Sequence, residues 1–288
     1  MNDLKIFDSL SHIKKDGSWY GTHHDASLER LLKQFDKGLS KTFLVGMPND
    51  DVSYLIEVAK KHSDKFVPIA PIEFDANTSL EELEKQISKY KDLGFKGIKI
   101  HPRFLNTNLT DKKIIDSIKL AGKYDLVSLL CTIHRAPSKP LKRPIFDVIH
   151  EICDETQKSK TILLHGGYYD LLATSEVIRS YENVLLDLST TIMRFQDTSL
   201  IDDVRFLFKT FDKKVCIGSD FPEHTIYDVI KVIQLNKLNA ITNAKLENIY
   251  FNNLASLFEK GVTSDNKNDN TKFKNLWGGE KTQVKMAA

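Results

Sequence analysis

Apolar residues along the chain gather in short runs, and each run is followed by a segment with helical spacing. Most positions within a run are Val, Ile, Leu or Phe, which is typical of parallel strands that are covered on both faces. Eight such strands are predicted, at residues 4–12, 41–46, 66–74, 97–101, 126–134, 161–165, 183–189 and 214–220.

The segments between the runs predict helices. The stretch "SLERLLKQFDKG" (27–38) repeats leucine at helical spacing and ends in Gly38, which suits a C-terminal cap. Further helices are expected at residues 50–62, 79–94, 111–123, 143–157, 169–181, 199–212, 225–236 and 243–260. Eight strand-then-helix units over residues 1–261 predict a single-domain α/β protein, a (β/α)8 TIM barrel. Periodicity alone leaves a doubly wound open sheet as the alternative. Residues 262–288 are polar and predict a flexible tail.

Composition limits the class of protein and its partners. Hydrophobic residues make up 41% and charged residues 28% of the chain, with a net charge of +2, so neither a nucleic-acid nor a membrane partner is expected. The 3 cysteines include no CxxC pair, which argues against a disulfide framework and a zinc ribbon. No signal peptide and no apolar run of ~18 residues is found. The expected location is therefore the cytoplasm.

Residues capable of chemistry follow the ends of the predicted strands. In chain order these are His12, Asn49, Glu73, His101, His134, His165, Ser189 and Asp220. Functional side chains of a TIM barrel lie at the carboxyl ends of its strands, so this set is expected at one mouth. His and Asp side chains that converge there suit a divalent metal such as zinc, which lowers the pKa of its bound water to about 7. A nearby carboxylate could take the proton of that water and pass it to the leaving group, which is metal-assisted hydrolysis.

In their order and spacing, the motifs at these strand ends resemble the amidohydrolase superfamily, in its amidohydrolase-2 (amidohydrolase-related) branch. The resemblance covers about residues 4 to 260. It is carried by "GFKGIKIHP" (94–102), "VSLLCTIH" (127–134), "ILLHGG" (162–167), "VLLDLST" (184–190) and "CIGSDFP" (216–222).

The resemblance implies a ligand set. His12 matches the second histidine of the family's first-strand His-x-His, while His134 and Asp220 match the ligands on strands five and eight. Asp220 would also shuttle the proton, and His165 matches the sixth-strand histidine that assists catalysis or binds a second metal. Leu10 stands where the first ligand is expected, on a strand face that alternation assigns to Asp8, Leu10 and His12 together.

Three outcomes of the Leu10 substitution stay open. The metal is held by His12, His134 and Asp220, with or without His165. Alternatively, a histidine of the first loop, His23 or His24, supplies the missing ligand. In the third case the site is free of metal, and Asp220 and a histidine form an acid–base pair.

Cationic residues near the strand ends suit an anionic small molecule as substrate, with a solvated basic loop as the alternative. Lys99 and His101 share one face of the fourth strand, and Arg103 follows them. The loop "HRAPSKPLKRP" (134–144) begins with Arg135 beside His134, and arginine suits carboxylate or phosphate.

Three functions follow from these observations. The first is a metal-dependent hydrolase of a C–N, ester or lactone bond, with decarboxylation as a close variant. The second is an altered barrel that binds a ligand without catalysis, with Leu10 as the sign of a lost site. A phosphodiesterase or nuclease is the third, and the small net charge counts against it. A homo-oligomer is compatible with each of them.

Overall fold

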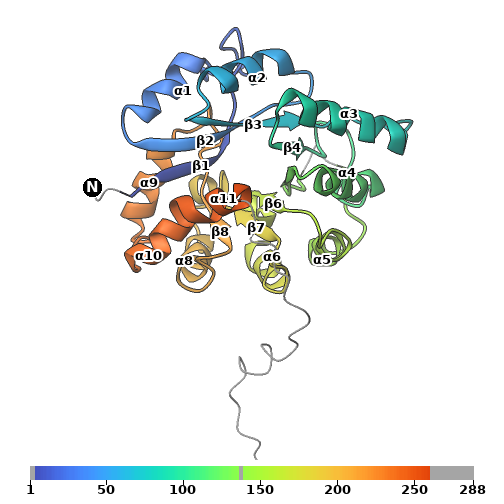
Figure 1. Cartoon of the computed structure of the whole chain (residues 1–288). Helices are drawn as coiled ribbons and strands as arrows, with labels where there is room; N and C mark the ends of the chain where they lie inside the picture. The colour runs from blue at the N-terminus through green and yellow to red at the C-terminus, as the bar shows by residue number, and fades with distance from the viewer. Residues whose placement is uncertain (1–3, 136–138, 260–288) are drawn as a thin grey trace, which may run out of the picture. The chain divides into compact units, whose positions relative to one another are not determined.

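The computed structural model describes residues 4–135 and 139–259, and the chain up to Leu257 forms one compact unit. Its eight strands pair in chain order and in parallel, which confirms the predicted TIM barrel. The helices surround the strands (Figure 1). The strands are β1 (Ile6–Ser11), β2 (Leu39–Val45), β3 (Phe66–Pro71), β4 (Gly97–Ile100), β5 (Val127–Cys131), β6 (Thr161–Leu164), β7 (Val184–Asp187) and β8 (Val215–Cys216).

Six of the helices begin directly after a residue whose side chain caps the first turn, close to the start that the sequence predicts. Ser79 and Glu82 form a reciprocal capping box at the start of α3. The helices are α1 (Leu28–Phe35), α2 (Val52–Lys61), α3 (Leu80–Leu93), α4 (Lys112–Lys123), α5 (Ile145–Glu155), α6 (Leu171–Ile178), α7 (Thr191–Arg194), α8 (Leu200–Thr210), α9 (Ile226–Leu235), α10 (Asn243–Glu247) and α11 (Asn253–Ala255), with the shorter turns η1 (His165–Gly167), η2 (Asn248–Asn252) and η3 (Ser256–Phe258).

The last strand closes the barrel although it is much shorter than the predicted run 214–220. Ser9 N donates to Ile217 O at 3.0 Å and His12 N to Phe221 O at 2.8 Å, so the chain after β8 lies along β1. This contact excludes the open sheet. The ladder is interrupted because Ser219 N donates to the Asp8 carboxylate at 2.8 Å instead of to a strand carbonyl.

The barrel interior is filled by an apolar cluster that a late segment of the chain completes. Phe7 and Leu10 of β1 pack there with Cys216 of β8 and with Leu254 of α11. The amide of Asn253 donates at 2.7 Å to the carbonyl of Val215, at the start of β8. The helix predicted over 243–260 is confirmed in the described part of that range, where α10, a π-helical stretch and α11 follow one another without a break and seal the N-terminal end of the barrel.

The remaining predictions concern the tail, membrane spans and cysteine pairing. The predicted tail 262–288 lies outside the described residues. In the described residues, no helix combines the length and the apolar character that crossing a membrane requires. All three cysteines, Cys131, Cys153 and Cys216, are free and buried.

Candidate active site

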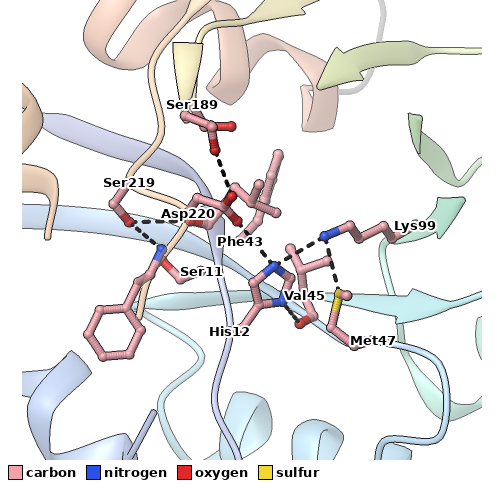
Figure 2. Close-up of polar contacts among 12 residues, drawn as sticks. Ser11, His12, Phe43, Val45, Met47, Lys99, Ser189, Ser219 and Asp220 are labelled. Atoms are coloured by element: carbon pink, nitrogen blue, oxygen red, sulfur yellow. Dashed lines mark hydrogen bonds and ion pairs between the residues drawn. The ribbon is translucent and has the colours of Figure 1, made fainter. Parts of the chain in front are cut away.

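His12, Lys99 and Asp220 meet at the carboxyl ends of the strands. The ammonium nitrogen of Lys99 lies 3.1 Å from His12 Nε2, and Asp220 Oδ1 lies 3.5 Å from the same ring nitrogen. Figure 2 shows the His12 ring between the other two side chains. His12 and Lys99 are almost fully buried, whereas 17% of the Asp220 side chain is exposed. Asp220 is therefore the member of the group that a solute can reach.

The orientation of the His12 ring is fixed on its far side. His12 Nδ1 lies 2.6 Å from the carbonyl oxygen of Val45, which can only accept, so Nδ1 carries the hydrogen. Nε2 then faces Lys99 and Asp220. The ring of Trp19 stacks on His12 at 5.2 Å and covers it. Burial first and the charge of Lys99 second lower the pKa of His12, against the opposing effect of Asp220.

Asp220 is held as a carboxylate by its neighbours. Its Oδ2 accepts a hydrogen bond from Thr190 Oγ1 at 2.7 Å, and its backbone is in the left-handed region with φ of 53°. Burial alone would raise the pKa of Asp220. The positive charges of His165 and Lys99 outweigh burial and hold this pKa well below its usual range. The group is therefore ionised at neutral pH.

A second cluster surrounds Cys131, the last residue of β5. Burial would raise the pKa of the Cys131 thiol, but the rings of His101 and His165 lower it well below its usual value. Burial likewise acts to lower the pKa of His165, yet Cys131 and nearby carboxylates raise it to about 9. His101 is buried and its Nδ1 has no hydrogen-bond partner. Cys131 was not among the predicted site residues, although alternation along 127, 129 and 131 places it on the inward face of β5.

His134 does not join either cluster. It follows the end of β5 by three residues, and its Nε2 pairs with Asp170 Oδ2 at 3.2 Å while Nδ1 lies 3.1 Å from Thr132 O. The predicted ligand role of His134 therefore stays a prediction, since β5 ends at Cys131 and His134 lies in the loop beyond it, paired with Asp170. Over residues 4–135 and 139–259, no three His, Cys, Asp or Glu side chains are arranged to hold a metal ion.

Asp8, Leu10 and His12 do not share one face of β1, contrary to the prediction. The pairing of β1 with β2 shifts in register between Asp8 and Ser11, so simple alternation fails there. Asp8 is fully buried and bonds to Ser219 and Ser11, whereas Leu10 packs in the apolar interior. The rings of the first-loop residues His23 and His24 contact each other at a tilt, with centroids 4.4 Å apart.

The expected substrate-binding residues lie at different depths. Lys99 and His101 are buried, and Arg103 is half-buried with its Nε unpartnered. Arg135 is exposed, and its guanidinium lies 5.8 Å from the centre of the Tyr168 ring. Arg194, which the sequence analysis did not identify, lies 5.6 Å from the same ring. Arg194 is the last residue of the short helix α7, so no strand pattern in the sequence could have revealed it.

Comparison with known proteins adds a family and a fold. The sequence profile of the family described as Amidohydrolase matches residues 42–225. An uncharacterised TIM-barrel protein, Bb4693, of Bordetella bronchiseptica has a TM-score of 0.73 at 15% identity, over 88% of this chain and 98% of that one. No curated protein matches the chain.

Two enzymes are also similar in structure. A 5-carboxyvanillate decarboxylase of Novosphingobium aromaticivorans, complexed with manganese and 4-hydroxy-3-methoxy-5-nitrobenzoic acid, has a TM-score of 0.63 at 13% identity, over 89% of this chain and 96% of that one. Dihydroorotase of Campylobacter jejuni has a TM-score of 0.59 at 13% identity, over 90% and 85%. At these identities the likeness shows a shared fold.

Proposed function

The chain belongs to the amidohydrolase family, and on that premise we propose that it is an enzyme that hydrolyses an ester, lactone or C–N bond of a small molecule. The observation that carries the proposal is the ionised, partly exposed Asp220 carboxylate beside His12 and Lys99 at the barrel mouth. Asp220 takes a proton from the attacking water and returns it to the leaving group.

The metal that the family resemblance implies, with zinc first, was tested against the donors of this chain. The structurally similar 5-carboxyvanillate decarboxylase is complexed with manganese. Here His12 Nε2 and Asp220 Oδ1 are 3.5 Å apart and could share an ion, but His134 is paired elsewhere and Leu10 offers no donor. Catalytic sites of this kind use about three protein ligands. The donors therefore do not fit such an ion, and the proton steps are assigned to side chains alone.

An anionic substrate fits the charge of the mouth. Lys99, His101, Arg103 and Arg135 are the proposed binding groups. Arg103 and Arg135 have no acidic partner among the described residues. The cations around Asp220 that hold it ionised also make it a weak base. A bound carboxylate would cancel part of that positive charge and strengthen Asp220 as a base. His165, with its raised pKa, assists by its charge.

Substitution of Asp220 by asparagine tests the proposal. A panel of esters, lactones and amides is screened first, with and without a carboxylate, and release of carbon dioxide from aromatic carboxylates is measured for the decarboxylation variant. Asp220→Asn should lower kcat/KM by at least ~10²-fold without lowering the melting temperature. The exposed-site substitution Asp64→Asn is the control. Equal turnover by Asp220→Asn and wild type would remove Asp220 from the mechanism.

One observation favours a second candidate, a barrel that binds a ligand without catalysis. The expected metal ligands do not converge in the part of the chain that the structure describes. Binding of an anionic compound with no turnover of any compound in the panel would favour this candidate.

The three free, buried cysteines support the cytoplasm, a reducing compartment, as the proposed location.

A further inference from the structure

Lys99 is a buried lysine without a direct counter-ion; burial lowers the pKa of its ammonium, and the charge of Asp220 opposes that shift. Its side chain enters the barrel from β4 and is 3% exposed. Its ammonium contacts His12 Nε2 at 3.1 Å and Met47 Sδ at 3.4 Å, and among the described residues it makes no ion pair with a carboxylate. A cation buried in this way is costly for the fold, and such costs concentrate at functional sites.

The Lys99 ammonium lies on the side of His12 where a metal ion would bind the ring nitrogen. Since His12 Nδ1 carries the hydrogen and donates it to Val45 O, Nε2 is unprotonated, and its lone pair can bind a metal ion or accept a hydrogen bond. An ion bound to that lone pair would lie about 2.1 Å from Nε2. Lys99 directs its own hydrogen at the same lone pair, and Asp220 lies on the adjacent side. Ion and ammonium cannot both occupy this place.

We propose that the Lys99 ammonium supplies the positive charge that a metal ion would otherwise supply in this site, so that the reaction is metal-independent. The inference deepens the proposed function and rests on it. Lys99 donates a hydrogen bond to the carbonyl oxygen of the substrate. Water attacks the carbonyl carbon, its proton passes to Asp220, and negative charge forms on the oxygen beside the ammonium. The oxygen re-forms its double bond, the bond to the leaving group breaks, and the leaving group takes the proton from Asp220.

The geometry selects carbonyl substrates that carry an additional anionic group. A fixed cation at the carbonyl oxygen stabilises the negative charge that develops there, as preorganised donors do in other hydrolases. His101 Nδ1 and Arg103 Nε are buried and unpartnered next to β4, so both remain available as donors to a carboxylate. His12 acts through Lys99 and is a positioning residue.

Metal content gives a first test that needs no substrate. Wild-type protein is purified without a chelator or a metal-affinity tag, and its zinc, manganese and iron are measured. We expect less than about a tenth of an equivalent of each, and no loss of melting temperature with a chelator. A stoichiometric ion whose removal lowers the melting temperature or abolishes activity would overturn the inference.

Substitution of Lys99 by histidine tests the location. The imidazole introduced by Lys99→His removes the competing ammonium and adds a third donor to His12 and Asp220. Zinc chloride should raise the melting temperature of Lys99→His by about 5 °C or more, and that of wild type not at all. Lys60→His, on the exposed face of α2, is the control. A folded Lys99→His variant with no zinc response would show that Lys99 does not occupy a metal position.

Two further variants keep the test decisive if Lys99→His does not fold. Lys99→Met should lower kcat by ~10²-fold or more, whereas Lys99→Arg, which keeps the charge, should lose less. Unchanged kcat in Lys99→Met would overturn the inference. A metal-free wild type that turns over no compound would refute the proposed hydrolase and leave the Lys99 placement intact. Hydrolysis that depends on a bound metal would support the proposed hydrolase and overturn the inference about Lys99.

Discussion

Asp187 joins three strand ends through a single carboxylate, which makes its replacement by asparagine informative. Oδ1 accepts from Ser189 N at 3.1 Å and from the Ser9 hydroxyl, and Oδ2 accepts from His165 N at 3.1 Å and from the Ser189 hydroxyl. Each oxygen thus receives one backbone N–H and one hydroxyl. An asparagine amide must turn its NH2 toward one of the two backbone donors, which cannot rotate away.

The structure contains a matched control in Asp8, which is equally buried and also accepts four hydrogen bonds. Both backbone donors, Leu10 N at 3.1 Å and Ser219 N at 2.8 Å, bind Asp8 Oδ1, and the hydroxyls of Ser11 and Ser219 bind Oδ2. An asparagine there can keep its oxygen on the backbone donors. Its NH2 then faces two hydroxyls, which can rotate and accept.

Magnitudes follow from this difference. A buried N–H left without an acceptor costs about 1–3 kcal/mol, and loss of charge-assisted bonds adds to that, so Asp187→Asn should lower the free energy of unfolding by about 2–4 kcal/mol. Asp8→Asn should lower it by less than about 1 kcal/mol at pH 7. Urea unfolding with a shared m-value gives both numbers. Equal losses in the two variants would refute the assignment of donors to oxygens.

Three further predictions concern the same region. Burial raises the pKa of Asp8 to about 6, so the folded state holds this proton more tightly than the unfolded state. Wild type should therefore gain about 2.5 kcal/mol relative to Asp8→Asn as pH falls from 7 to 4, measured by urea unfolding, and a constant difference would contradict this. Leu10→His places an imidazole in the apolar interior and should lower the free energy of unfolding by about 2–4 kcal/mol, whereas an unchanged value would mean that Leu10 is not packed there. A methyl group on Gly218 would lie 2.2 Å from Ser9 Oγ, so Gly218→Ala should lower the melting temperature by several degrees through the loss of the Ser9–Asp187 bond, while an unaltered melting temperature would show that the bond is dispensable.

The fold was predictable because it depends on long apolar patterns. Buried parallel strands and amphipathic helices each need several residues of one kind, so their presence and order follow from the sequence. The exceptions have local causes. β8 stops early because Asp8 takes the Ser219 N–H, and the predicted helix 243–260 widens to a π-helical turn just before Asn253, whose amide binds the carbonyl of Val215.

The site was predictable only in part, because it depends on which way single side chains point. Position at a strand end was enough to bring His12, Lys99 and Asp220 into consideration. The direction of each side chain could not be predicted, since a register shift in β1 separates Asp8 from Leu10, and Asp220 adopts a left-handed backbone. A histidine beyond the end of β5 looked like a ligand in sequence, although the inward position belongs to Cys131.

The seal at the N-terminal end of the barrel constrains how the chain folds during synthesis. Phe7 and Leu254 fill the same interior cluster although almost the whole barrel separates them in sequence. A ribosome-bound chain that has not yet released Leu254 exposes that apolar interior, and contacts of such wide separation form late. Completion of the core therefore waits until the last helix has left the exit tunnel, and translation that stops before it yields a chain prone to aggregation.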